Sequence, residues 1–159
     1  MHSILNLLHD NGALSARQIA DSLGKNEAEI SEKIKELEDN HVILGYKAII
    51  DWERAGSEYV IARIEVSVTP QHGQGFENIA EEICRFDEVE SLYLMSGGYD
   101  FAVTVTGRTM KEVALFVAYK LSTIEGVRGT ATHFVLKKYK EGGILYSNVK
   151  SQQETAFLV

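Results

Sequence analysis

The sequence of 159 residues has little of several residue types, and each shortage excludes a class of protein. Its only cysteine, Cys84, excludes an intramolecular disulfide and a multi-cysteine zinc site, which is typical of a reducing compartment. A single proline excludes a proline-rich array. No apolar run approaches the roughly 18 residues of a membrane span, and residues 1–10 lack the features of a signal peptide. We therefore expect a cytoplasmic protein that does not bind membranes.

The chain also lacks groupings of catalytic or metal-binding residues. Its five histidines lie in five different predicted elements, and no two have the i, i+4 spacing of a helical metal site. Neither a phosphate-binding loop nor a dinucleotide-binding glycine motif occurs. Cys84 follows Ile83 in a predicted helix, where we expect a buried, unreactive cysteine. We predict no enzyme activity, no catalytic or metal-binding residue, and no cofactor.

The charge is acidic overall, with 16 Lys and Arg against 23 Asp and Glu and a formal net charge of −7. Residues 1–50 hold 5 basic and 8 acidic residues, and residues 51–159 hold 11 and 15. Neither part is a basic block. If the protein binds nucleic acid, it does so through a local patch and not through its overall field.

Residues 1–43 predict three short helices. Ser15 and Gln18 have the spacing of a capping box that opens the second helix, and Gly24 ends that helix. Asn26 is a suitable cap for a third helix, whose apolar residues follow the i, i+4, i+7 spacing at Ile30, Ile34 and Leu37. A short helix, a tight turn and a longer amphipathic helix are typical of a helix-turn-helix. A helical bundle that serves only as an interaction module has the same spacing.

Residues 44–56 are predicted to connect two domains. Tyr46, Ala48 and Ile50 alternate as in a strand, and such a strand needs a partner for its backbone groups. At the other end of the chain, residues 141–159 form a tail. There Gly142-Gly143 precedes Ile144–Tyr146, which either adds a hairpin strand or frays.

Residues 57–140 predict a ferredoxin-like domain with the order βαββαβ. Period-two alternation starts at Val60, helical spacing returns between residues 76 and 83, and further strands are predicted over 89–95, 101–106 and 130–138. The fold class is therefore α+β, with an N-terminal helix-turn-helix domain. We expect the sheet face without helices to hold Tyr59, Ile61, Leu92 and Leu94, which is too apolar for open water and predicts association there.

Three motifs occur in order along this arrangement. They are residues 37–43 (Leu-Glu-Asp-Asn-His-Val-Ile), residues 97–100 (Gly-Gly-Tyr-Asp) and residues 126–132 (Gly-Val-Arg-Gly-Thr-Ala-Thr). Together they resemble the Lrp/AsnC family of "feast/famine" transcriptional regulators over roughly residues 3–140. The resemblance implies that the N-terminal domain reads double-stranded DNA. It also implies that the C-terminal (RAM) domain assembles the protein and senses a small molecule, usually an amino acid.

The resemblance further implies homodimers that assemble into tetramers or octamers, with connecting strands paired between partners and an effector pocket between dimers. Candidate DNA contacts are Ser15, Arg17, Gln18, Lys25, Asn26, Ser31, Lys33 and Lys35. Candidate effector contacts are Met95, Ser96, Gly97, Gly98, Tyr99, Asp100, Thr130 and Thr132.

An amino-acid zwitterion needs donors for its carboxylate and an acceptor for its ammonium group. The backbone N–H groups of Gly97 and Gly98 would serve as donors, since no Cβ intervenes, and Asp100 would accept from the ammonium. The alternative is that the two glycines only form a turn and that Asp100 only stabilises it.

Two departures from the family pattern bear on DNA binding. Several glutamates dilute Lys33 and Lys35 on the third helix, although phosphate contacts favour Lys and Arg. His41 stands where the family usually has Gly, which predicts a non-glycine residue with positive φ. One alternative function is therefore a ligand-sensing oligomeric module with weak or no DNA binding that acts through protein partners. Another is an enzyme of the sirohaem decarboxylase type, which lacks support because no His or Arg set is clustered.

Overall fold

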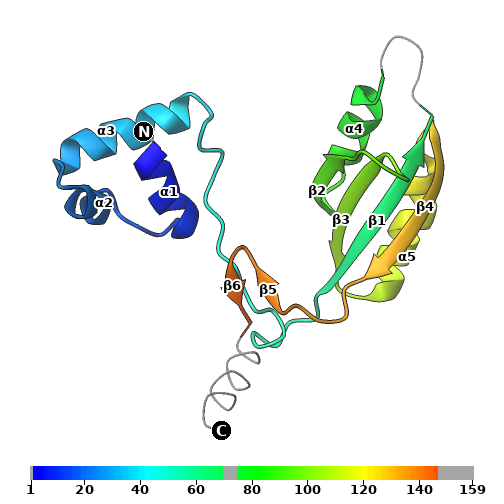
Figure 1. The fold of residues 1–159 in the computed structure, drawn as a ribbon. Helices are drawn as coiled ribbons and strands as arrows, with labels where there is room; N and C mark the ends of the chain where they lie inside the picture. The colour runs from blue at the N-terminus through cyan, green and yellow to red at the C-terminus, as the bar shows by residue number, and fades with distance from the viewer. Residues whose placement is uncertain (1, 70–74, 147–159) are drawn as a thin grey trace, which may run out of the picture. The chain divides into compact units, whose positions relative to one another are not determined.

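The computed structural model describes residues 2–69 and 75–146, and the chain forms two compact units (Figure 1). One unit comprises Met1–Ile50 with Lys140–Val159, and we call it the helical unit. The other comprises Asp51–Tyr139, and we call it the sheet unit. The predicted C-terminal domain began at residue 57 and ended at residue 140, whereas the compact sheet unit also takes in residues 51–56.

The helical unit contains the three predicted helices. They are α1 (His2–Asp10), α2 (Ala16–Leu23) and α3 (Glu27–Asp39). Each helix is amphipathic, and its apolar side chains meet in one small core. The buried members of this core are Ile4, Ile19, Ala20, Ile30 and Leu37.

The helix ends form as the sequence predicts. The Ser15 hydroxyl accepts from Gln18 N at 3.2 Å, and the Gln18 side chain accepts from Ser15 N at 2.9 Å, which completes the capping box. Gly24 has φ 63°, and the Asn26 side chain accepts from Ala28 N at 2.8 Å. His41 has φ 54° and is the only non-glycine residue with positive φ among the described residues, which confirms that prediction.

Within one chain, residues 46–50 form no strand, and the predicted pairing of this segment with a partner's copy stays a prediction. A strand is defined by its ladder to a neighbour, and within one chain this segment has no such ladder among the described residues. The helical unit does contain a hairpin of β5 (Lys140–Glu141) and β6 (Ile144–Leu145), turned by Gly142 and Gly143 at φ 52° and 82°. This confirms the hairpin alternative, and residues 147–159 of the predicted tail lie outside the described residues.

The sheet unit has the ferredoxin-like topology. Its strands are β1 (Val60–Val68), β2 (Val89–Leu94), β3 (Phe101–Gly107) and β4 (Val127–Phe134), in the antiparallel order β2-β3-β1-β4. The helices are α4 (Glu77–Cys84) and α5 (Met110–Tyr119), followed by the short 3-10 helix η1 (Leu121–Thr123). The last strand begins and ends earlier than the predicted 130–138. The sequence also predicts a turn-rich loop from Pro70 to Gly75, and almost all of it lies outside the described residues.

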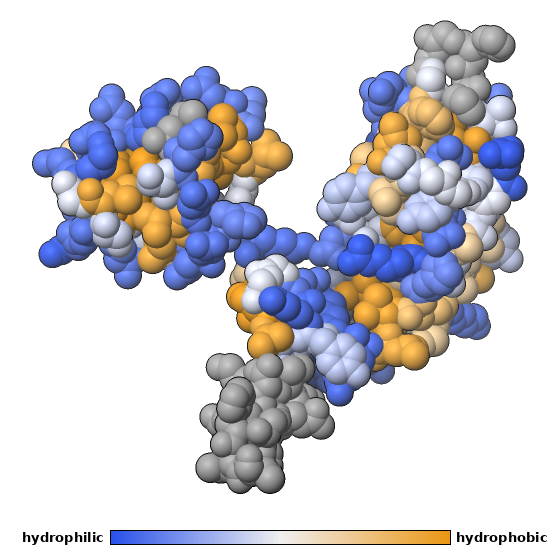
Figure 2. Space-filling view, viewed as in Figure 1, coloured by the Kyte–Doolittle hydropathy of each residue, from blue (hydrophilic) through white to orange (hydrophobic). Residues whose placement is uncertain are grey.

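Helices α4 and α5 cover one face of the sheet. Alternate residues of β1 point toward them, and fourteen buried side chains form a single core with them. That core includes Ile64 and Val66 from β1, Phe101 from β3, Ile83 from α4 and Phe116 from α5. Other hydrophobic side chains of this unit lie at the surface, where Figure 2 shows them in orange.

The prediction for the other sheet face is wrong at two positions. Leu92 pairs with Val103 and Leu94 with Phe101, so both leucines lie in register with core residues on the helix-covered side. The register of β2 shifts between Val89 and Ser91, and this irregularity changes which residues of the strand point to each face. Ile61 does lie on the other face, although it is only 8% exposed.

The prediction for Cys84 is also wrong, because its side chain is exposed. Ile79 and Ile83 are buried at i, i+4 in α4. The next residue lies about 100° farther around the helix, which turns Cys84 away from the core. Among the residues that the structure describes, no helix is long and apolar enough to cross a membrane.

Candidate nucleic-acid interface and effector site

Helices α2 and α3 and the turn between them hold all eight predicted DNA contacts. Seven of the eight side chains are exposed, and Lys33 is half-buried. Gly24 and Asn26 fix the turn, because the first ends α2 in the left-handed conformation and the second caps α3. The local sequence therefore presents these side chains on a small, well-defined helical scaffold.

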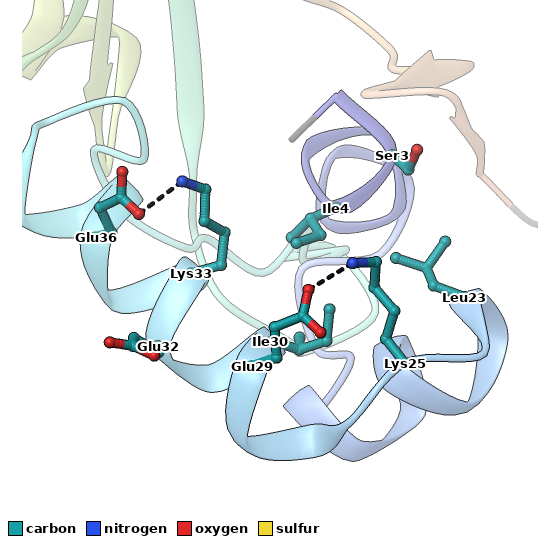
Figure 3. Close-up of a pocket in the computed structure, with 9 residues that line it drawn as sticks. All are labelled: Ser3, Ile4, Leu23, Lys25, Glu29, Ile30, Glu32, Lys33 and Glu36. Carbon is teal, nitrogen blue, oxygen red and sulfur yellow. Dashed lines mark hydrogen bonds and ion pairs between the residues drawn. The ribbon is translucent and has the colours of Figure 1, made fainter.

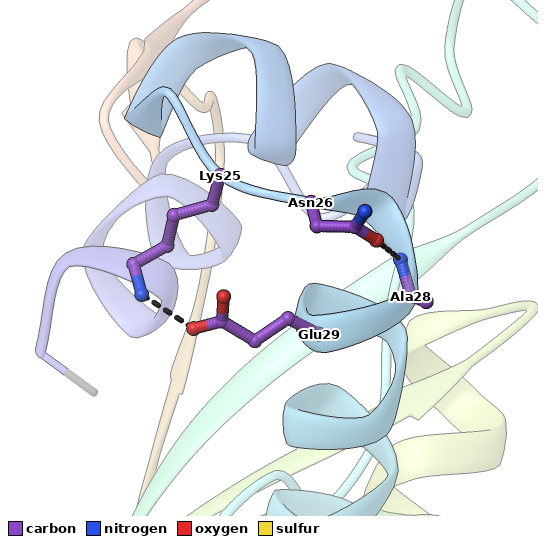
Figure 4. Close-up of polar contacts among 4 residues, drawn as sticks. All are labelled: Lys25, Asn26, Ala28 and Glu29. Atoms are coloured by element: carbon purple, nitrogen blue, oxygen red, sulfur yellow. Dashed lines mark hydrogen bonds and ion pairs between the residues drawn. The ribbon is translucent and has the colours of Figure 1, made fainter.

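Two of the predicted lysines form ion pairs with glutamates of α3. Lys25 Nζ lies 2.5 Å from Glu29 Oε1, as Figure 4 shows, and Lys33 Nζ lies 2.6 Å from Glu36 Oε2. In contrast, Arg17 and Lys35 form no ion pair within residues 2–69 and 75–146. The predicted cations thus divide into a paired set and an unpaired set.

The paired set lies along one flank of α3. Both ion pairs line a hollow of about 530 Å³ together with Ser3 and Ile4 of α1 (Figure 3). Ser31 and Lys35 do not line this hollow, and their i, i+4 spacing places them on another face of the helix. The structure therefore does not bring all the predicted contacts to one face.

The chain after α3 is tied back to that helix. Val42 N donates to Leu37 O at 2.9 Å, which closes the left-handed turn at His41. The Tyr46 hydroxyl donates to Glu38 Oε1 at 2.9 Å. Partial burial and the neighbouring Glu38 carboxylate raise the pKa of Tyr46 above its usual range. These contacts anchor the start of the connecting segment to the end of α3.

The predicted effector residues 95–100 form the loop between β2 and β3. Met95 N donates to Asp100 O at 2.8 Å, and Asp100 N donates to Val66 O at 3.0 Å. One oxygen of the Asp100 carboxylate accepts from Val68 N at 2.8 Å. Asp100 therefore holds the loop against the end of β1, which is the stabilising role that the sequence left open.

The two glycines of this loop differ in what the fold requires of them. Gly97 has φ 141°, a conformation that side chains rarely adopt. At Gly98 no positive φ is present, and an added Cβ would meet no atom within 4 Å. The fold itself therefore requires glycine at position 97, whereas the space beside position 98 has room for another molecule.

Thr130 and Thr132 lie on β4 and face the helix-covered side. They pair with the buried residues Val66 and Ile64 of β1, and the Thr130 hydroxyl lies 3.4 Å from that of Ser122. Thr130 lies at the same end of the sheet as the loop, with β1 between them. Thr132 lies two residues farther along β4. Within one chain, the two threonines and the loop thus occupy neighbouring but separate positions.

Sequence reasoning missed the ion pairs on α3 and the bond between Asp100 and the backbone of β1. The first had a readable signal, since Lys25 and Glu29 are spaced i, i+4 and Lys33 and Glu36 are spaced i, i+3. The second had none, because Val68 and Asp100 are 32 residues apart and meet only when the sheet forms.

Comparison with known proteins assigns a family model to each of the two domains. Residues 2–43 match the family model of a winged helix-turn-helix DNA-binding domain, and residues 61–145 match that of the Lrp/AsnC ligand binding domain. The uncharacterized HTH-type transcriptional regulator YugG of Bacillus subtilis is 47% identical over 144 residues, which cover 90% of this chain and 87% of YugG.

Two solved structures share the fold. A transcriptional regulator of Neisseria meningitidis in complex with L-Met has a TM-score of 0.68 and 24% identity, covering 87% of this chain and 89% of that one. The feast or famine regulatory protein of M. tuberculosis complexed with L-methionine has a TM-score of 0.72 and 19% identity, covering 88% and 92%.

Proposed function

The chain belongs to the Lrp/AsnC family of transcriptional regulators, and we propose that it binds double-stranded DNA under the control of an amino acid or a related small metabolite. The observation that carries this proposal is that both matched regions occur in one chain in the family's order, over residues 2–43 and 61–145. DNA binding is assigned to the helical unit, and effector binding is assigned to the loop of the sheet unit.

The assignment to DNA is supported by the geometry of α2 and α3. A helix-turn-helix inserts its second helix into the major groove, where exposed polar side chains reach base edges and cations reach phosphates. Ser31 and Lys35 occupy exposed positions on α3, and Arg17 and Gln18 are exposed at the start of α2. These side chains have the chemistry that such a contact requires.

The assignment to an amino-acid effector is supported by the loop at residues 95–100, of which residues 95–98 are exposed. Asp100 anchors this loop to β1, and the open space where a Gly98 Cβ would lie leaves room for a small anionic group to approach the backbone. In this proposal Asp100 is a positioning residue. The L-methionine complexes of the two structural neighbours make an amino acid the first class of effector to test.

We further propose that effector binding acts through assembly of homodimers into larger rings. A ligand shifts such an equilibrium only through its different affinities for the two assemblies. The alternative, a sensing module without DNA binding, is less favoured because the chain's relatives are named HTH-type transcriptional regulators.

The first experiment is to measure the light-scattering mass and the melting temperature of the full chain with and without each amino acid. We expect a dimer or larger assembly whose mass or melting temperature changes with one amino acid, and whose affinity for its own upstream DNA changes with it. A monomer would contradict the assembly proposal. A large assembly that responds to no amino acid would contradict an amino-acid effector and leave only the related small metabolites.

Two glycine-to-alanine variants test the proposed effector site itself. Gly98→Ala should leave folding unchanged and weaken effector binding, because the added methyl group meets solvent in the free protein and the ligand in the complex. Gly45→Ala is the matched control, since Gly45 also lies in open space without positive φ. Equal effector affinity in both variants would contradict the assignment of this loop.

A further inference from the structure

Helix α3 carries more negative than positive charge, which is unusual for a helix that approaches DNA. It holds six acidic residues and two lysines. The phosphate backbone repels carboxylates, and phosphate contacts supply most of the sequence-independent affinity for a duplex. The acidic residues of α3 therefore oppose binding to DNA, and their positions show which cations they affect.

Glu29 and Glu36 each affect one of the predicted DNA contacts. Each of them holds one lysine of the predicted DNA set, at 2.5 Å from Lys25 and 2.6 Å from Lys33. Both pairs lie on the flank of α3 that faces Ser3 and Ile4 of α1 (Figure 3). Two of the unit's cations are thus neutralised within the unit itself, on one side of the helix.

We propose that Glu29 and Glu36 restrain Lys25 and Lys33 from binding DNA phosphates, and so lower the sequence-independent affinity of this regulator for DNA. This inference rests on the proposed DNA-binding function. Arg17 and Lys35, which have no ion pair in the described part of the chain, then supply the phosphate contacts. Contacts to base edges then supply a larger share of the affinity for DNA than they would if Lys25 and Lys33 were also free to bind phosphates.

The physical reason is competition between two kinds of anion. A lysine held by a carboxylate must leave it, or share it, before its charge can displace counterions from a phosphate. Exposed ion pairs are weak, so the restraint on each lysine amounts to no more than about fivefold in affinity. Because each assembled protein presents several helical units, these factors multiply across the complex.

The test measures the affinity of the full-length protein for a mixed-sequence duplex by fluorescence anisotropy at several salt concentrations from about 50 to 200 mM. The test variant is Glu29→Gln with Glu36→Gln. The matched control is Glu27→Gln with Glu32→Gln, which removes the same charge from the same helix, and neither of these acids forms an ion pair in the described residues. Circular dichroism melting checks that both variants fold.

We expect the test variant to bind about tenfold more tightly per helical unit, against about twofold for the control. The slope of log affinity against log salt should steepen by about 0.9 for each released lysine in the test variant only. Equal gains and equal slopes in the two variants would overturn the proposal, because they would show a general charge effect.

A second set of variants separates this inference from the proposed function. Lys25→Ala with Lys33→Ala should leave wild-type affinity within about twofold and should abolish the gain of the test variant. A large loss in the wild-type background would overturn the proposal, since the lysines would then already contact DNA. If the wild type and every variant fail to bind any duplex at low salt, the DNA-binding function itself fails.

Discussion

The helical unit and the sheet unit are stabilised in different ways. The helical unit buries five residues in its core, whereas the sheet unit buries fourteen around two helices and four strands. Small cores supply little net stability, so local devices such as caps and turns matter more in the helical unit. The comparison teaches that the DNA-binding domain has the smaller core of the two and the ligand binding domain the larger one.

The strongest test of this comparison is a cavity in the larger core. Phe101 is 1% exposed and packs edge-on against Phe76 with ring centroids 5.8 Å apart. Phe101→Ala should lower the free energy of unfolding of the sheet unit by about 3–5 kcal/mol, as measured by urea denaturation. Tyr93→Ala is the control, because Tyr93 lies on the adjacent strand and is 58% exposed. Equal losses would contradict the burial that defines this core.

A cavity in the core of the helical unit should cost less free energy of unfolding, but it should unfold that unit alone. Ile19 is fully buried in the helical unit, and Ile19→Ala should destabilise that unit by about 2–4 kcal/mol. Because the helical unit has less stability to lose, it should unfold first while the sheet unit and the assembly persist. Loss of DNA binding with an unchanged light-scattering mass would bear this out, whereas simultaneous unfolding of both units would show that they are one cooperative structure.

The third expected effect concerns a cap. Ser15→Ala removes the acceptor for Gln18 N and should destabilise the helical unit by about 1 kcal/mol in thermal unfolding. Thr109→Ala removes the corresponding acceptor at the start of α5 in the sheet unit, where the hydroxyl accepts from Glu112 N at 3.1 Å. The same loss should lower the melting temperature of the sheet unit less, because its core is larger. An equal shift would weaken the comparison.

The smallest expected effect is a gain. His41 adopts φ 54°, which is unfavourable for a residue with a Cβ. His41→Gly should therefore raise the stability of the helical unit by up to about 1 kcal/mol, measured as a higher midpoint in urea. Asn40→Gly is a suitable control, since Asn40 has φ −87° and no such strain is relieved there. A loss of stability at position 41 would show that the imidazole makes a contact that outweighs the strain.

Local patterns were sufficient to predict most of the fold. The capping box at Ser15 and the turn at Gly24 depend on neighbours within a few residues, and both are confirmed. The order βαββαβ also followed from the change between period two and helical spacing. Such features are readable because their energetics are local.

The predictions that were wrong depended on distant parts of the chain. The face of Leu92 depends on a register shift in β2. The exposure of Cys84 depends on where α4 meets the sheet. No sequence pattern within a few residues predicts the register of a strand or the orientation of a helix on the sheet.

The sequence by itself determined the elements, their order and the family motifs, because hydrophobic period and helix capping act over a few residues. Only the tertiary structure decided that Asp100 binds the backbone of Val68 and that the flank of α3 with the two ion pairs lies beside α1. The first contact joins residues 32 positions apart through the pairing of β1 with β3. The second depends on how the apolar side chains of α1 and α3 pack together, which orients α3.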